Sequence, residues 1–378
     1  MTLGNLSRHV KTSRPTMVAL LIGLAAVMTL GLTPTLVAPA HATAVTCGQT
    51  LDSGAFVLEA DLGPCDDPTG PTAVTVNGTA DTPASLDLAG FSVICQDLNG
   101  KKGVPVGIMV TGASVTITNG KVVGCKNGIQ LTGDGSHSVK SVTVDQSTSS
   151  GVLIKADSNR INAVTASNGN ADGIVVQGSN NTITKSAGTG NAGAGLTVQG
   201  GHNHVKANSA SGNAGAGYSV GGSHNKVAQN TADSNTGAGV AVTSDHNSAS
   251  GNTATNNAGG GYSISGNHVQ VKGNTATGNT SDGITLIGSA NKVSGNTASS
   301  NAGNGIAVNI TSSLNKLQTN VTDSNGKAGT TVSGLSNLIK GGEATTNTVV
   351  DLEDTNPNCD SNKWKGNTFG TASQSCIK

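Results

Sequence analysis

The sequence predicts an all-β fold, a parallel β-helix (solenoid) with about 22 residues and three short strands in each coil. Three observations predict it: a phrase that recurs at a fixed spacing, strand-like alternation within that phrase, and asparagines that recur in phase. The chain has 378 residues, of which 54 are glycine and only 2% are aromatic. This composition cannot fill one large core, but it can fill many thin layers in series.

The recurring phrase is a glycine followed by an apolar, a variable and a second apolar residue. It returns without slippage from Gly151 to Gly305 at a spacing of 22 (for example, 173 − 151). Looser copies at Gly107, Gly128 and Gly329 have irregular spacings (128 − 107, 151 − 128 and 329 − 305). Irregularity that is confined to the ends is typical of repeat proteins.

Each coil is expected to contain three strands. In the first, Ile174 and Val176 point inward and Val175 outward, the period of two that marks a strand with one buried face. An inward apolar residue such as Ile183 marks the second strand, and an Asn-Thr-Ala phrase such as 230–232 marks the third. A helical repeat is the alternative, but Gly, Asn, Thr and Val are poor helix formers, which disfavours it.

Two asparagine columns are expected at the turns, where amides one coil apart can donate to and accept from one another. One column contains Asn159, Asn181, Asn203, Asn225, Asn247, Asn291 and Asn337, with Val269 as the exception, and the other contains Asn191, Asn213, Asn235, Asn257, Asn279 and Asn301.

Residues 1–44 are expected to be a signal peptide, because Arg8 and Arg14 precede an apolar run from Met17 to Leu32. An N-terminal membrane anchor is the alternative for this run. The mature chain is then expected to contain an N-terminal disulfide-containing cap (45–81), the β-helix (82–342) and a C-terminal cap (343–378). The mature chain has no second apolar segment long enough to span a bilayer. Together with the signal peptide, this predicts a secreted, extracellular or cell-envelope protein. We also expect the protein to be a monomer.

Six cysteines fall in the exported part and outside the regular repeats, which indicates disulfides. Six cysteines allow about 15 connectivities. Closeness along the chain favours three pairs, namely Cys47 with Cys65, Cys95 with Cys125, and Cys359 with Cys376.

The coils resemble the right-handed parallel β-helix repeat family, which shares its architecture with pectate lyases, polygalacturonases and alginate epimerases. The resemblance covers about 82–342. The segment 85–91 (SLDLAGF) resembles the family's first full coil, and 356–370 resembles a closing segment of secreted bacterial members. Many such proteins have no assigned reaction, and fold alone does not supply one.

No catalytic constellation is evident, so the catalytic residues are unknown. Asp172 and Asp282 share one phase but lie five coils apart, roughly 24 Å, which is too far for paired acid and base work. The formal net charge of zero gives no support to a nucleic-acid partner.

One trail of basic residues shares a single phase and is a candidate for binding an anionic polysaccharide or cell-envelope glycan. Its members are Arg160, His204, Lys226, Lys292 and Lys316, and Thr182, Ser248 and Gln270 interrupt it. A solvated face that discourages lateral sheet pairing is the simpler reading of the same trail.

A histidine column is also expected, since His202, His224, His246 and His268 recur at one phase (for example, 224 − 202). Imidazoles about 4.8 Å apart either stack or hold a transition metal, and no other cofactor is expected. A copied turn position with no ligand is the plainer reading.

The leading hypothesis is therefore a secreted surface or polysaccharide-binding structural protein without catalysis. A polysaccharide lyase, epimerase or hydrolase is the rival, with its groups where the repeats break down, near 134–160 or 309–327. Metal binding by the histidine column is the second alternative.

Overall fold

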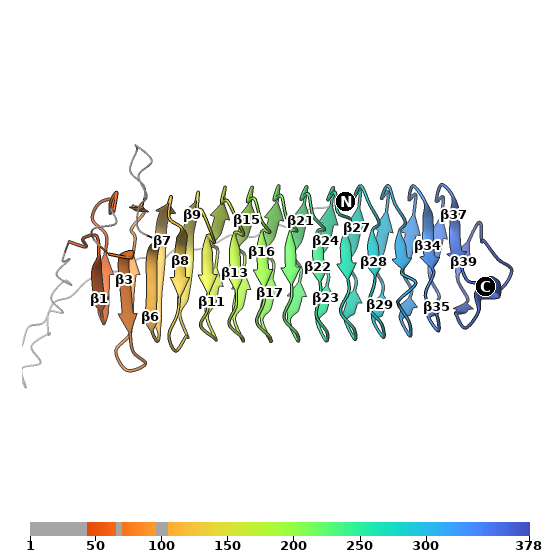
Figure 1. The fold of residues 1–378 in the computed structure, drawn as a ribbon, viewed down its shortest axis with the longest axis horizontal. Helices are drawn as coiled ribbons and strands as arrows, with labels where there is room; N and C mark the ends of the chain where they lie inside the picture. The colour runs from red at the N-terminus through yellow and green to blue at the C-terminus, as the bar shows by residue number, and fades with distance from the viewer. Residues whose placement is uncertain (1–43, 66–69, 96–104) are drawn as a thin grey trace, which may run out of the picture. The chain divides into compact units, whose positions relative to one another are not determined.

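The computed structural model describes residues 44–65, 70–95 and 105–378. These residues form a parallel β-helix, and one short 3-10 helix, η2 (Pro357–Cys359), lies near its C-terminal end. Figure 1 shows its coils stacked side by side along one axis. Each strand pairs in parallel with the equivalent strand of the next coil, so residues of equal phase are direct neighbours. The predicted signal peptide lies outside the described residues, apart from Ala44.

Each coil contributes strands to three outward-looking surfaces, which we call faces 1, 2 and 3. Face 1 is a 14-stranded sheet that contains the strands of the glycine phrase. Its strands are β1 (Gln49–Asp52), β3 (Thr72–Gly78), β6 (Val106–Gly112), β8 (Asn127–Leu131), β10 (Val152–Ile154), β13 (Ile174–Val176), β16 (Leu196–Val198), β19 (Tyr218–Val220), β22 (Val240–Val242), β25 (Tyr262–Ile264), β28 (Ile284–Leu286), β31 (Ile306–Val308), β34 (Ala328–Val332) and β37 (Val350–Asp354).

Face 2 is the ladder of second strands. Its strands are β2 (Gly54–Val57), β4 (Ala84–Asp87), the first parts of β7 (Val115–Val123) and β9 (Ser138–Asp145), β11 (Arg160–Asn162), β14 (Thr182–Thr184), β17 (His204–Lys206), β20 (Lys226–Ala228), β23 (Ser248–Ser250), β26 (Gln270–Lys272), β29 (Lys292–Ser294), β32 (Lys316–Gln318), β35 (Leu338–Lys340) and β38 (Lys363–Lys365).

Face 3 is the ladder of third strands. Its strands are β5 (Ser92–Ile94), the second parts of β7 and β9, β12 (Thr165–Ser167), β15 (Ala187–Thr189), β18 (Ser209–Ser211), β21 (Thr231–Asp233), β24 (Thr253–Thr255), β27 (Thr275–Thr277), β30 (Thr297–Ser299), β33 (Val321–Asp323), β36 (Glu343–Thr345) and β39 (Thr368–Phe369). The predicted three strands per coil are therefore confirmed.

The interior is a continuous thin core of inward side chains. Ile174, Val176 and Ile183 are fully buried, as the period of two predicts. Tyr218 and Tyr262 also point inward, and the Tyr262 hydroxyl donates to the carbonyl of Asn252 at 2.7 Å. Because burial desolvates both phenols, the pKa of each lies above its ordinary value.

Close stacking explains why glycine opens each phrase. A Cβ atom on Gly173 would lie 2.7 Å from the carbonyl oxygen of Gly195 and 2.8 Å from the Asn191 amide nitrogen. Since both contacts are shorter than side chains tolerate, a larger residue would force neighbouring coils apart.

Both predicted asparagine ladders are present and buried. The Asn203 side chain accepts from the backbone N–H of Asn181 at 2.8 Å and donates to the carbonyl of Gly178 at 3.0 Å. A third ladder, which we did not predict, stands at the turn between faces 2 and 3. There, Asn208 donates to the carbonyl of Ile183 at 3.0 Å. All three ladders satisfy turn groups that the strands leave unpaired.

His137 takes the place of an asparagine at the head of the first ladder. Its Nδ1 accepts from the backbone N–H of Val115 at 3.2 Å, and its Nε2 lies 2.8 Å from the carbonyl of Thr132, to which it donates in the neutral form. Burial lowers the pKa of His137, and the Thr132 hydrogen bond and the Asp134 charge oppose this only in part. The neutral imidazole therefore takes the place of a side-chain amide, with one ring nitrogen accepting and the other donating a hydrogen bond.

The three disulfides that closeness along the chain favoured are all present: Cys47–Cys65, Cys95–Cys125 and Cys359–Cys376. They lie toward the two ends of the β-helix, where each terminal coil has a neighbour on one side only. Parallel pairing also continues into the segments expected as caps, through β1 and β3 at one end and β38 and β39 at the other. No helix in the described part of the chain is long and apolar enough to cross a membrane.

Candidate functional site

Face 2 gathers the predicted basic trail into one vertical column. Arg160 pairs with Thr182, which pairs with His204, and the register then continues through Lys226. The remaining members follow at the same position, in the order Ser248, Gln270, Lys292 and Lys316. The structure therefore places all five predicted residues on one surface, with the three interruptions where the sequence put them.

A second column of cations, which the sequence analysis missed, runs beside the first. Lys206, Lys272 and Lys340 each lie two residues after a position of the first column, namely His204, Gln270 and Leu338, and point to the same side of the strand. Ala228, Ser250 and other neutral residues separate them, so the period is visible only when both outward positions of each strand are compared.

Carboxylates are absent from the outward positions of face 2 from β11 to β38. Within the described residues, the one ion pair is between Lys121 and Asp145 at 3.2 Å, and it lies on face 3. The lysines of face 2 therefore have no carboxylate partner there. Although the formal net charge of the chain is zero, the charged side chains on face 2 from β11 to β38 are all positive.

A shallow hollow of about 300 Å³ lies between the two columns and is lined by His204, Lys206 and Lys226. The Nε2 atom of His204 is buried and has no hydrogen-bond partner among the described residues. Burial, followed by the charges of Lys226 and Lys206, lowers the pKa of His204. An anion in this hollow would gain from the charges of both lysines.

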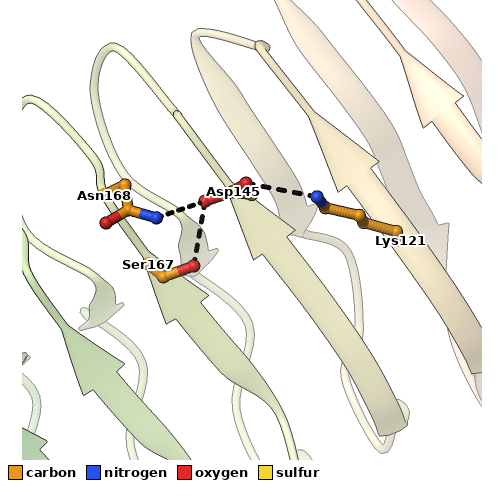
Figure 2. A network of polar contacts seen from close by, with 4 residues as sticks. All are labelled: Lys121, Asp145, Ser167 and Asn168. Atoms are coloured by element: carbon orange, nitrogen blue, oxygen red, sulfur yellow. Dashed lines mark hydrogen bonds and ion pairs between the residues drawn. The ribbon is translucent and has the colours of Figure 1, made fainter.

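On face 3, unlike face 2 from β11 to β38, carboxylates are present, and Asp145 and Asp233 are held by neighbouring side chains. Asp145 accepts from the Ser167 hydroxyl at 3.0 Å and the Asn168 amide at 2.9 Å, and pairs with Lys121, as Figure 2 shows. Burial of this carboxylate is outweighed by those bonds and by the lysine, so the pKa of Asp145 lies below its ordinary value. Asp233 is held in the same way, at 2.6 Å from the hydroxyl of Thr255.

The predicted histidine column is present at the turn between faces 1 and 2. Neighbouring rings in the order His202, His224, His246 and His268 have centroids 5.0, 5.1 and 5.1 Å apart and planes within 7°, 2° and 5°. All four side chains are exposed. No group of three or more His, Cys, Asp or Glu side chains in the described ranges is placed to hold a metal ion.

A second hollow, of about 540 Å³, lies over face 1 where an insertion lengthens one coil. Asn309, Ile310, Lys327, Asp282 and Glu353 are among its lining residues. Asp282 accepts from the backbone N–H of Asn304 at 2.7 Å. Since Asp282 and Glu353 lie on coils three steps apart, about 14 Å along the axis, they cannot act on one glycosidic bond as a carboxylate pair.

Comparison with known proteins agrees with this architecture. The model of the family described as right handed beta helix region matches residues 106–254 and 238–369. Comparison with curated protein sequences gives no match.

Among solved structures, the A-module of mannuronan C-5 epimerase AlgE6 from Azotobacter vinelandii is 12% identical, with a TM-score of 0.40, over 87% of this chain and 86% of that chain. The periplasmic alginate epimerase AlgG is 15% identical, with a TM-score of 0.46, over 86% and 85%. The Dettilon tailspike protein (gp208) is 16% identical, with a TM-score of 0.45, over 83% and 63%. These likenesses concern the fold alone. Because the family model matches more than half of its residues, the chain belongs to the right-handed β-helix family.

Proposed function

We propose that face 2 binds an anionic extracellular polysaccharide, and that the protein acts as a binding or structural module without catalysis. The observation that carries this proposal is the pair of cation columns with no carboxylate among them from β11 to β38. Lysines with no partner on the protein are available to a ligand, whereas lysines paired on their own surface are not.

The repetition of face 2 favours a polymer over a small molecule. Equivalent positions recur in every coil, about 4.8 Å apart along the axis of the β-helix. The two columns are two residues apart in each strand, so they lie about 6.6 Å from each other along the strand direction. A polyuronate carries one carboxylate on each sugar, so it offers many equivalent anions in a row. Each exposed contact is weak, at about 1 kcal/mol or less, but contacts along one polymer add together.

Two features favour a polysaccharide over a nucleic acid. The three disulfides point to an oxidising compartment outside the cytoplasm, in agreement with the predicted secretion signal. In addition, no outward position of face 2 from β11 to β38 carries a Phe, Tyr or Trp side chain on which a base could stack.

The test is equilibrium binding of the mature chain to polygalacturonate, with uncharged dextran as the matched polymer, across a series of salt concentrations. We expect binding to polygalacturonate that weakens steadily as salt screens the contacts, and no binding to dextran. Equal binding to both polymers, or binding that is insensitive to salt, would contradict the proposal.

The hollow over face 1 favours a second candidate, a polysaccharide-acting enzyme, because it lies in the segment where the repeats break down and joins Lys327 to two carboxylates. Incubation with uronic-acid polymers, followed by ultraviolet absorbance of unsaturated products and by reducing-end assay, separates the two functions. We expect no turnover. Turnover that is abolished by Asp282→Asn would replace the binding proposal with the enzymatic one.

A further inference from the structure

The imidazole column of His202, His224, His246 and His268 occupies a turn that does not need histidine. All four residues have positive φ, between 54° and 59°. The equivalent turns of other coils adopt the same conformation with other residues, namely Ser158 (59°), Asn180 (58°), Ala290 (56°) and Leu314 (59°). The backbone therefore explains the turn but not the choice of imidazole on four consecutive coils.

The four rings are exposed and contact one another by stacking. The backbone N–H groups of His202 and His246 hold the turn by donating to carbonyls of the following coil, at 3.2 and 3.0 Å. The imidazoles themselves form no hydrogen bond or ion pair with any residue in the described ranges, and they are exposed. Each ring therefore presents unused nitrogen atoms along one edge of the β-helix.

The spacing suits two-imidazole coordination. With parallel rings about 5 Å apart, equivalent nitrogens are also about 5 Å apart. An ion bonded to two nitrogens at about 2.1 Å each needs them within about 4.2 Å, and each nitrogen lone pair lies in the plane of its ring, so the two rings must leave the stacked arrangement and turn until their lone pairs converge on the ion. No third protein ligand stands nearby in the described part of the chain. Water then completes the coordination, which suits the tetragonal geometry of Cu²⁺.

We propose that neighbouring imidazoles of this column bind divalent copper. Four rings taken in adjacent pairs hold at most two ions per chain, one between His202 and His224 and one between His246 and His268. Copper binds more tightly than nickel or zinc, as the order of affinities for nitrogen ligands requires.

The pairing can be tested with two double variants that each remove two imidazoles. His224→Asn with His246→Asn leaves two rings three coils apart, whereas His202→Asn with His268→Asn leaves the central neighbours in place. Asparagine is tolerated by the turn, since Asn180 already occupies it. Titration of the untagged chain with CuCl₂, by calorimetry and by electron paramagnetic resonance, gives the stoichiometry and the number of bound nitrogens.

We expect two ions for the natural chain, one for the His202 and His268 double variant, and at least a tenfold loss of affinity for the His224 and His246 double variant. His204→Gln, which removes an imidazole outside the column, should leave both ions bound. Equal behaviour of the two double variants, or no copper binding by a natural chain that melts cooperatively, would overturn the proposal.

Discussion

Faces 2 and 3 are built by the same coils and enclose the same core, yet their outer surfaces differ in chemistry. Lys226 and Lys292 on face 2 have no acidic neighbour on that face, whereas Asp145 and Asp233 on face 3 are each held by side chains of the following coil. Inward positions are constrained by stacking, but outward positions are not. Because the same outward position recurs on every coil, similar residues at that position give a whole face its chemical character.

The largest expected effect follows from removing the charge of face 2. Replacing Lys226, Lys292 and Lys316 by Gln should weaken binding to polygalacturonate by about 100-fold at low salt, since each contact contributes about 1 kcal/mol. Replacing Lys121, Lys155 and Lys327, which lie outside face 2, removes the same charge and should change affinity less than about threefold. Equal losses in these two binding assays would mean that net charge, and not face 2, controls binding.

Filling the gaps of the first column should sharpen the contrast between the faces. Ser248→Lys places a cation next to Lys226 in the register and should strengthen polymer binding about fivefold. Ser248→Asp places a carboxylate there, which would pair with that lysine and weaken binding by a similar factor. If the two variants bind the polymer with equal affinity in the same titration, the proposal that face 2 binds by electrostatic attraction is contradicted.

Face 3 predicts an effect on stability. Asp145→Asn removes the Lys121 ion pair and weakens two hydrogen bonds, so the free energy of unfolding should fall by about 1 kcal/mol at neutral pH. Since the pKa of Asp145 is lowered in the folded state, this stability is present above its ordinary value and is lost as pH falls through the folded value. Urea denaturation at neutral and acid pH measures both. Lys121→Gln, which leaves the hydrogen bonds in place, should cost less.

The smallest effect at neutral pH is expected inside the turn between faces 1 and 2. His137→Asn keeps an amide at the head of the ladder and should change stability little at pH 7.5. Burial lowers the folded-state pKa of His137 below 6.5, so the unfolded chain binds the proton more readily. Natural protein should therefore lose stability as pH falls below about 6.5, and the variant should lose less. Identical pH dependence in chemical denaturation would show that His137 is not the group responsible.

Sequence periodicity predicted most of the fold because each coil obeys the same constraints. Gly173 must be small, Ile174 and Val176 must be apolar, and Asn203 must bond to the preceding coil. The third asparagine ladder was missed because its Asn-Thr-Ala phrase was interpreted only as a strand marker. His137 was missed because its imidazole replaces an amide, and a search for identical residues does not find it.

The candidate site was predicted in part, for a related reason. The first cation column has one phase and few gaps, whereas Lys206 and Lys272 are separated by neutral residues in theirs. Core packing does not constrain the residues at outward positions, so their pattern can be recognised only when the register of the strands shows which residues are neighbours. The hollow near Ile310 depends on an insertion, whose shape periodicity does not define.

The central claim is that the polymer lies along face 2. Lysine acetylation, followed by mass spectrometry with and without polygalacturonate, measures this directly. We predict that Lys226, Lys292 and Lys316 are protected by the polymer, while Lys121 and Lys155 react at an unchanged rate. Protection that is uniform over all five lysines, or greater at Lys121 and Lys155, would contradict the account.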